Sequence, residues 1–332
     1  MWNEYGECES LYLCCGAISA GFRVKSAGNR HKHAISPLFF LTWSAAAFQD
    51  ESTQDGAMII NSLCVCPFAP SSPNAMLPIS IIIPCYNAAA TLARTLDSCI
   101  IQPEAAQIIV VDDGSTDRSI EIARYYGERD PRIGLLQMPA NGGAARARNW
   151  AALHATQPLL AFIDADDEYL PGALAAASGY LEQNPTEASI RLDVEYTGFP
   201  AEITAHPDFA EHAATLSNTV PSSLIIRRAV YAALGGFPMD AFFRRNGGED
   251  GAFSWALREL FGNRRLGDAR RVRMHYHPRI HAERYFRICF GMQAPVAADV
   301  EESFRLSGQF VEAARANIAQ LRSLSGPAGT PA

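Results

Sequence analysis

Between residues 76 and 184 the chain alternates short apolar runs with segments of helical period, and this alternation restricts the fold more than any other feature. The apolar runs read ISIII, QIIVV, IGLLQM and LLAFI, at 79–83, 107–111, 133–138 and 159–163. Strands that are apolar throughout are typical of a parallel sheet with helices on both faces. We therefore predict an α/β fold with a Rossmann-like, mostly parallel sheet flanked by helices.

A polar cluster follows each of the four predicted strands. The clusters read PCYN, DDGS, NGG and DADD, at 84–87, 112–115, 141–143 and 164–167. In the last cluster Asp164, Asp166 and Asp167 repel one another unless a cation or hydrogen-bond donors offset the repulsion. Because ligands bind beyond the carboxyl ends of the strands in open sheets, we predict one site built from all four clusters, with a divalent metal at the aspartates.

The remaining regions are less regular, and we divide the chain into four parts. Residues 76–184 form the predicted donor half, 185–280 a mixed half with strands at 189–199, 221–228 and 270–277, and 281–332 a helical extension with a loose tail. The helix predicted at 299–321 has a polar face that mixes Glu and Arg, which favours packing or a partner helix over membrane docking. Residues 1–75 show no sustained period, so we interpret them as a poorly ordered extension or a gene-model artefact with translation starting at Met76.

Charge, hydropathy and cysteine usage exclude several classes of protein. The formal net charge is -7 at pH 7, which argues against a general nucleic-acid binder. No apolar run approaches the roughly 20 residues that a membrane-spanning helix needs. Five of the eight cysteines precede residue 76 and show no zinc spacing, so we expect a reducing compartment rather than a disulfide framework.

The motifs SIIIPCYN, IIVVDDGSTD, NGGAARARN, FIDADD, LGGF, GGED and YHP occur in this order between Leu77 and Pro278. As a series they resemble the family 2 glycosyltransferases, which are inverting, nucleotide-sugar-dependent enzymes of the GT-A fold. The resemblance implies transfer of a sugar from a UDP or GDP donor to an acceptor hydroxyl, in polysaccharide or glycoconjugate synthesis. No QxxRW-type sequence follows the ED pair, so we expect a single or limited transfer rather than processive synthesis.

The resemblance assigns donor-site roles to residues of the strand-end clusters. It places the nucleotide base and ribose near Pro84, Tyr86, Asn87, Asp112, Asp113 and Asp164, and a metal at Asp166 and His277. Arg146 and Arg148 lie two residues apart near a helix start and so point in different directions; we assign the phosphate contact to Arg148, with Arg146 as the alternative. The cofactor implied is Mn²⁺ or Mg²⁺, which spreads the charge of the leaving diphosphate. Bland alternatives stay open: an Asp–Gly turn at 113–114, a helix cap by Asp167 for a helix beginning near Pro171, and simple packing of Tyr86 or His277.

The ED pair of the GGED motif carries the expected catalytic chemistry. An inverting transfer needs a base that takes the proton of the acceptor hydroxyl, and the resemblance gives this role to Asp250. Glu249 then orients the acceptor or makes a structural contact. The alternative is that both acids only complement the dipole of the helix that they open.

The expected partners are the nucleotide sugar and a glycan, lipid-linked or small-molecule acceptor, whose specificity we expect in residues 185–245 and the C-terminal helix. We expect a cytoplasmic protein without nucleic acid or a membrane span, while peripheral contact with the inner face of a membrane stays open. One rival is a phosphotransferase of the haloacid dehalogenase type, although Glu168 stands where such enzymes carry Thr or Val. The other is a catalytically inactive sugar- or nucleotide-binding relative.

Overall fold

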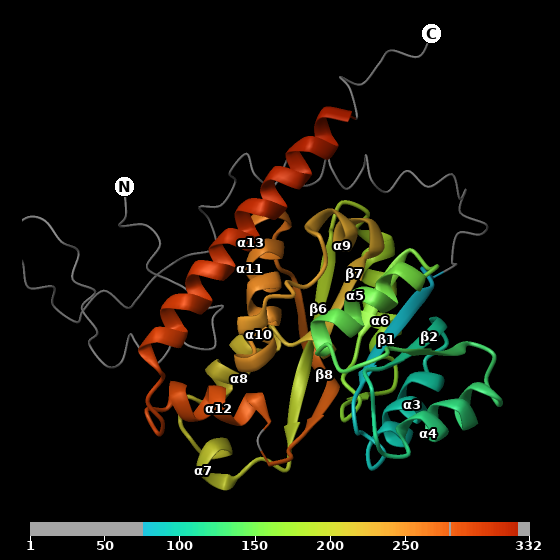
Figure 1. Cartoon of the computed structure of the whole chain (residues 1–332), viewed down its shortest axis with the longest axis horizontal. Coiled ribbons are helices and arrows are strands. Elements are labelled where there is room, and N and C mark those ends of the chain that lie inside the picture. The colour runs from blue at the N-terminus through green and yellow to red at the C-terminus, as the bar shows by residue number, and fades with distance from the viewer. Residues whose placement is uncertain (1–75, 279, 325–332) are drawn as a thin grey trace, which may run out of the picture.

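The computed structural model describes residues 76–278 and 280–324 (Figure 1). The expectations for residues 1–75, including a start at Met76, lie outside the described residues except for Met76 itself. Within the described part, no helix has the length and apolar character required to cross a membrane.

An eight-stranded sheet in the order β3-β2-β1-β4-β7-β6-β8-β5 runs through the described residues. In chain order the strands are β1 (Ile79–Cys85), β2 (Ala105–Asp112), β3 (Ile133–Gln137), β4 (Leu159–Phe162), β5 (Glu168–Tyr169), β6 (Ser189–Thr197), β7 (Leu224–Arg227) and β8 (Arg265–His275). The first four pair in parallel, β7 runs antiparallel to β4 and β6, β6 pairs in parallel with β8, and β5 runs antiparallel to β8. The predicted parallel half and mixed half are both present.

Helices cover both faces of this sheet and form two hydrophobic cores. One core takes residues from α3 (Leu92–Ile100), α4 (Ser119–Gly127), α6 (Ala173–Gln183), α7 (Ala201–Thr204), α8 (Phe209–Ser217) and α12 (His281–Cys289). The other takes residues from α5 (Ala144–His154), α9 (Arg228–Leu234), α11 (Glu249–Phe261) and α13 (Ala297–Leu324). Successive side chains of a strand point to opposite faces, so Ile81 enters the first core and Ile82 the second.

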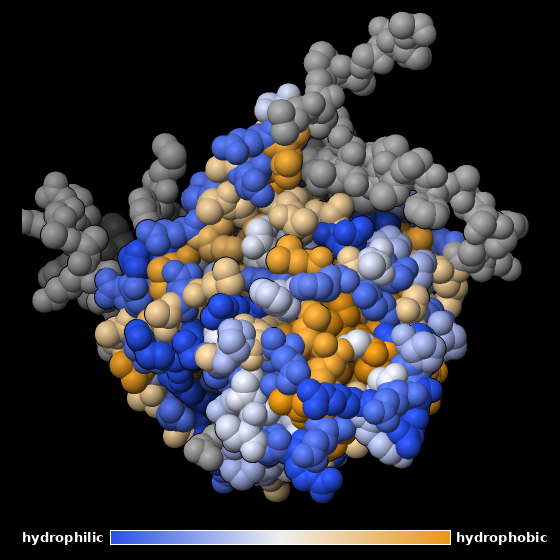
Figure 2. All heavy atoms as spheres, turned by 45° about the vertical axis from the view of Figure 1, so that its right-hand side comes forward, coloured by the Kyte–Doolittle hydropathy of each residue, from blue (hydrophilic) through white to orange (hydrophobic). Residues whose placement is uncertain are grey.

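The long helix α13 packs against α11 and α9, and Figure 1 shows it running along one side of the molecule. The helix extends beyond both predicted ends, and Val311, Ala314 and Ile318 are buried in the second core. The prediction that this helix packs is therefore confirmed. Figure 2 brings the side of the molecule that carries α3 to α5 forward and shows a patch of hydrophobic residues bordered by hydrophilic ones.

Two predicted boundaries are wrong by two residues, and long-range pairing explains both. The helix expected near Pro171 begins at Ala173, because the N–H of Leu170 still bonds to the carbonyl of Arg271 beside the β5–β8 pair. The strand expected to end at His277 ends at His275, where its pairing with β6 ends opposite Thr197, three residues before the turn at Pro278. Neither partner segment is near in sequence, so local patterns did not locate these ends.

The loop that follows α9 is held by one side chain of α5. The Oδ1 atom of Asn149 accepts hydrogen bonds from the Tyr231 hydroxyl at 2.6 Å and the Phe237 N–H at 2.8 Å, and its Nδ2 donates to the Phe237 carbonyl at 2.8 Å. Gly236 has a φ of 75°, and a Cβ at this position would lie 2.5 Å from Asn149 Oδ1. The LGGF motif thus fits a close approach between this loop and α5.

We predict that Gly236→Ala lowers the free energy of unfolding by about 1 to 3 kcal/mol, because alanine is strained at positive φ and its Cβ displaces Asn149. The matched control is Gly179→Ala, inside α6, where a Cβ meets nothing within 4 Å and φ is ordinary. The control substitution should raise the free energy of unfolding by about 0.5 to 1 kcal/mol, because alanine is favoured over glycine inside a helix. Urea unfolding of both variants measures the difference, and equal effects would contradict the described contact.

Candidate functional site

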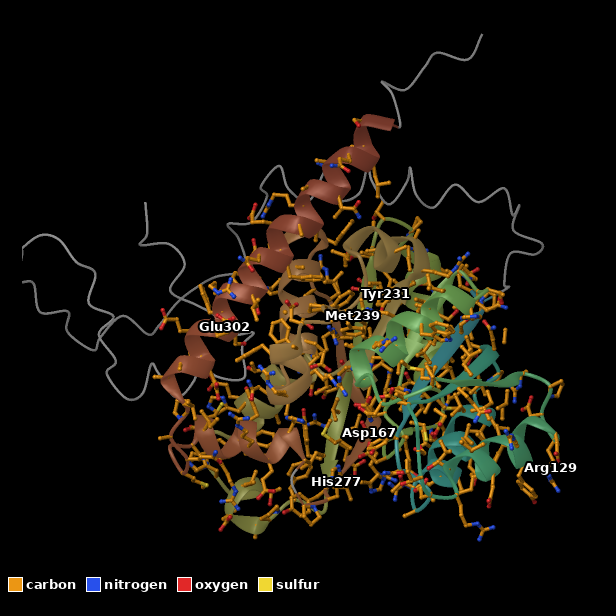
Figure 3. All side chains as sticks on the ribbon, in the orientation of Figure 1. Arg129, Asp167, Tyr231, Met239, His277 and Glu302 are labelled. Atoms are coloured by element: carbon orange, nitrogen blue, oxygen red, sulfur yellow. The ribbon has the colours of Figure 1, made fainter. Side chains whose placement is uncertain are left out.

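A cavity of about 760 Å³ lies at the carboxyl ends of β1 and β4, between the first turns of α5, α11 and α12. Ten of the eleven predicted site residues line it: Pro84, Tyr86, Asn87, Asp113, Arg148, Asp164, Asp166, Glu249, Asp250 and His277. The exception is Asp112. Figure 3 labels Asp167, which also lines the cavity, and His277 at the same edge of the sheet. The structure therefore brings together the four strand-end clusters and the ED pair.

The two aspartates at the end of β2 hold loops of the site. Asp112 is buried and accepts a hydrogen bond from the N–H of Gly114 at 3.2 Å. Asp113 Oδ1 accepts from the Gly142 N–H at 2.7 Å and its Oδ2 from the Gly143 N–H at 2.8 Å, which ties β2 to the start of α5. Gly114 has a φ of 79°, so the turn considered as an alternative is present. Contact of these carboxylates with a nucleotide base stays a prediction.

The loop after β1 is tied to the loop after β2 and leaves an aromatic ring exposed. Asn87, with a φ of 50°, accepts a hydrogen bond from the Thr116 N–H at 2.8 Å and donates its own N–H to Ser115 Oγ at 2.9 Å. Tyr86 is 51% exposed on the cavity wall, so packing within the protein does not account for this side chain. The two loops thus form a connected rim that includes Pro84.

Arg148 joins two of the acidic motifs from a buried position. Only 4% of its side chain is exposed; its Nη2 lies 2.6 Å from Asp164 Oδ1 and its Nη1 3.3 Å from Glu249 Oε1. The guanidinium also lies 5.3 Å from the centre of the Phe237 ring. Burial alone would lower the pKa of Arg148, but the neighbouring carboxylates, Asp164 first, raise it above its ordinary value. Its Nε has no hydrogen-bond partner within the described residues.

Asp167 is the most deeply buried acid of the DADD cluster. It is 2% exposed, and its Oδ2 accepts a hydrogen bond from the Ser222 hydroxyl at 2.7 Å. Ser222 Oγ in turn accepts from the Asp164 N–H at 3.1 Å. Burial, then Asp166 and Asp164, raise the pKa of Asp167 well above its usual range. The alternative that Asp167 caps the next helix is wrong, because α6 begins after Gly172 and has no side-chain cap.

Asp166 and His277 face each other across the cavity edge. His277 Nε2 lies 3.0 Å from Asp166 Oδ2, and the Asp166 carbonyl accepts a hydrogen bond from Arg94 Nη2 at 2.7 Å. Burial and then Asp164 raise the pKa of Asp166, while His277 acts in the opposite direction. Among the described residues no group of three or more His, Cys, Asp or Glu is arranged as a metal site.

The donor set of this pair nevertheless fits two positions of a divalent ion. Two neighbouring ligands of an octahedral ion, each at about 2.1 Å, lie about 3 Å apart, as Asp166 Oδ2 and His277 Nε2 do. Mg²⁺ is commonly held by one or two carboxylates together with substrate phosphates and water. The pair is therefore suited to an ion that a substrate helps to bind.

The ED pair forms the first turn of α11. Gly247 and Gly248 precede it with φ values of 77° and 102° and turn the chain sharply into the helix. Glu249 has the structural contact that the sequence left open, its ion pair with Arg148. Asp250 is 8% exposed and lines the cavity; its Oδ1 accepts the N–H of Gly251 at 2.8 Å. The helix dipole favours acids here, but it does not require that they line a cavity.

Several residues of the site carry no signal in the sequence. They hold motif residues or line the cavity: Arg94, Asn149, Ser222, Arg244, His281 and Arg284. Asn149 alone belongs to a quoted motif, the ARN of NGGAARARN. The others come from segments whose spatial neighbours are far away in the sequence.

We predict that Arg148→Met destabilises the fold by about 3 to 5 kcal/mol, because it leaves two carboxylates near a buried site without their counter-ion. The control is Arg146→Met, two residues earlier at an exposed position that forms no ion pair within the described residues. Chemical unfolding of both variants provides the measurement. If Arg148→Met lowers the free energy of unfolding no more than the control does, the two ion pairs contribute little to the stability of the fold.

Comparison with known proteins gives a family match and partial matches to individual relatives. The family model of glycosyl transferase family 2 matches residues 80–233. The succinoglycan biosynthesis protein ExoU of Rhizobium meliloti (strain 1021) is 43% identical over 96 residues, which are 29% of this chain and 28% of that protein. Validoxylamine A glucosyltransferase of Streptomyces hygroscopicus subsp. limoneus is 37% identical over 137 residues, 39% of this chain and 29% of that protein. The matched region thus spans less than a third of each of these two relatives.

Solved structures show the same fold at low identity. TarS 1-349 of S. aureus in complex with UDP-GlcNAc aligns with a TM-score of 0.54 and 20% identity, covering 70% of this chain and 66% of that one. The mannosyltransferase PcManGT of Pyrobaculum calidifontis, in complex with GDP-Man and Mn²⁺, aligns with a TM-score of 0.51 and 18% identity, covering 84% of each chain. Residues 80–233 therefore match glycosyl transferase family 2, and the alignments with solved structures show that the chain has the GT-A fold.

Proposed function

We propose that the cavity binds a UDP or GDP sugar and transfers the sugar, with inversion, to an acceptor hydroxyl. One observation carries the proposal: a single cavity is lined by all four strand-end clusters and by Asp250 of α11. Donor and acceptor can therefore meet beside one carboxylate. The structural neighbours in complex with UDP-GlcNAc and with GDP-Man support a nucleotide-sugar donor.

The donor lies along the rim formed by the loops after β1 and β2. Tyr86 offers an exposed ring face to the base, and Asn87 lies beside it. Asp112 and Asp113 shape the base pocket from behind, with Asp113 the one that lines the cavity. A carboxylate accepts a hydrogen bond from the N–H of a uracil or guanine edge, which is why both nucleotides fit.

The diphosphate lies at the end of β4, where Asp166 and His277 would hold Mn²⁺ or Mg²⁺. Such an ion supplies a positive charge that stabilises the leaving diphosphate. Asp164 is kept in place by Arg148 and contacts the ribose or the water around the ion. Both terminal nitrogens of Arg148 are paired with carboxylates and its Nε is buried, so the phosphate contact expected from the sequence stays a prediction.

The acceptor binds on the side of Asp250. Its hydroxyl oxygen attacks the anomeric carbon from the face opposite the diphosphate, so a new carbon–oxygen bond forms as the bond to the phosphate oxygen breaks. The phosphate oxygen takes the electron pair, and the Asp250 carboxylate takes the hydroxyl proton. Glu249 is held by Arg148, which keeps the first turn of α11 in position for this transfer.

The biological context follows from the relatives and remains part of the proposal. The similarity to ExoU supports a role in polysaccharide or glycoconjugate synthesis. A cytoplasmic location, with peripheral contact at a membrane left open, stays a prediction. The haloacid dehalogenase alternative loses support, because Glu168 bonds to His275 at 2.7 Å on β8 and is not a cavity-lining residue. An inactive relative is tested directly below.

We predict that Asp250→Asn binds the donor nucleotide normally and loses transfer by about 10²-fold or more, because it removes the base and leaves the diphosphate site unchanged. Isothermal titration with UDP and GDP measures binding, and release of nucleotide from the donor measures turnover. Asp268→Asn, an exposed aspartate of β8 paired only with Arg271, is the matched control. Turnover of Asp250→Asn close to that of the control would remove Asp250 from the mechanism.

We predict that UDP or GDP raises the unfolding temperature only together with Mn²⁺ or Mg²⁺, and that Asp166→Asn loses most of this shift. A ligand at about a hundred times its dissociation constant adds roughly 2.7 kcal/mol, which a thermal-shift measurement resolves. CMP and ADP serve as nucleotide controls, and Asp268→Asn again controls for the substitution. A metal-independent shift that Asp166→Asn retains would contradict the assigned ion site. No shift with any nucleotide would favour the inactive relative.

A further inference from the structure

The acidic and basic residues of the cavity come from different structural elements. The acids lie at the ends of β2 and β4 and at the start of α11, apart from Asp240, which opens α10. Helix α10 (Ala241–Asn246) and helix α12 contribute Arg244, His281 and Arg284. Besides Arg146 and Arg148 of α5 and His277 after β8, the basic residues of the cavity thus lie on the helices before and after α11, outside the strand-end clusters assigned to the donor.

Arg284 is directed into the cavity by the helical repeat of α12. His281, Arg284 and Ile288 are spaced by three and four residues and all three line the cavity, so they share one face of the helix. Arg287 lies on another part of the helix and is paired with Glu283 at 2.9 Å and with Glu202. Arg284 has no hydrogen bond or ion pair within the described part of the chain. Its partly buried guanidinium therefore faces the cavity with its charge unpaired.

His281 and Arg244 place two further basic groups near the same space. The His281 ring lies close to the turn before α11, since a Cβ on Gly247 would be 3.0 Å from its Cε1 atom. Gly247 is three residues before Asp250, so the imidazole is near the turn that positions the base. Arg244 donates to the Asn141 carbonyl at 2.7 Å and has no carboxylate partner among the described residues. This bond orients the guanidinium and leaves its charge unneutralised.

The acid on this side has a cation of its own nearby. Asp240 precedes α10 and lines the cavity. It contributes to the raised pKa of Arg305 on α13, after the larger contribution of Glu302. Arg305 is itself paired with Glu302 at 2.7 Å, and neither Arg305 nor Arg284 forms an ion pair with Asp240 among the described residues.

We propose that the acceptor is anionic and that Arg284 binds a carboxylate or phosphate group next to the hydroxyl that is glycosylated. This proposal rests on the transferase function proposed above and extends it to the class of acceptor. A guanidinium presents a planar pair of donors that matches both oxyanions, and the bonds are charge-assisted. An anionic acceptor near Asp250 and Glu249 would otherwise be repelled, so a cation opposite these acids allows it to approach. His281 and Arg244 add to the attraction.

The test measures acceptor preference with matched neutral and anionic probes. Methyl β-glucuronide is compared with methyl β-glucoside, and glycerol 1-phosphate with glycerol, each titrated into the full chain saturated with UDP or GDP and Mn²⁺. Wild type should bind the anionic member of at least one pair about tenfold or more tightly. The pair with the larger preference identifies the oxyanion, carboxylate or phosphate.

Three variants decide whether Arg284 carries the preference. Arg284→Gln should abolish the preference for the anionic probe and leave nucleotide affinity within about twofold. Arg284→Lys should keep part of the preference. Arg315→Gln, on the exposed face of α13, should keep all of the preference. Unfolding temperatures of all three confirm that they fold. Equal binding of anionic and neutral probes by wild type, with nucleotide binding intact, overturns the acceptor proposal alone. A parallel loss of nucleotide affinity in Arg284→Gln would place Arg284 on the donor diphosphate instead. Failure of wild type to bind any nucleotide would overturn both proposals.

Discussion

The buried ion pairs of Arg148 are the constraint on which the site depends. One guanidinium on α5 bonds to Asp164 after β4 and to Glu249 at the start of α11, so three elements far apart in the sequence meet at one charge. Burying such a group is costly unless its partners are well placed. The geometry of Asp164 and Glu249 is therefore coupled: a shift of either carboxylate weakens the compensation of the arginine and, through it, the position of the other. Two motifs to which the proposed function gives separate donor and acceptor roles therefore share one counter-ion.

The next residue of α5 adds a second, uncharged link. Consecutive helical residues point about 100° apart, so Asn149 reaches the loop after α9 while Arg148 reaches the cavity. The loop brings the Phe237 ring to 5.3 Å from the centre of the Arg148 guanidinium. Arg148 and Asn149 thus connect the LGGF and GGED motifs. Both motifs are attached to the same turn of α5: LGGF by the hydrogen bonds of the Asn149 amide, and GGED by the ion pair between Arg148 and Glu249.

The sequence predicted those features that depend on local pattern. Apolar runs and helical periods located the four parallel strands and their helices, and the rule that parallel strands end at one edge brought the clusters together before any coordinates were considered. The failures involve contacts between distant segments. Because β5 pairs with β8, the helix expected near Pro171 begins two residues later. Asp167 does not cap that helix but accepts a hydrogen bond from Ser222, a residue outside the recognised motifs. The sequence predicts Asp113 as a ligand or a turn residue. Its two hydrogen bonds from Gly142 and Gly143 join segments about thirty residues apart, so they could be found only in the folded structure.

Charge in the cavity raises a question that no single motif answers. In the proposed function an anionic diphosphate binds beside the strand-end acids, so a metal ion would be needed to reverse the sign of the local field. That ion would serve the donor and would be held at one end of the cavity by Asp166 and His277. A metal ion there would not compensate the charge of Arg284 on α12, which has no ion pair among the described residues, whereas Glu249 is already paired with Arg148. An unpaired cation kept partly out of water loses solvation without compensation until a ligand supplies the anion. The α12 wall therefore favours a negatively charged ligand, independently of which sugar the donor carries.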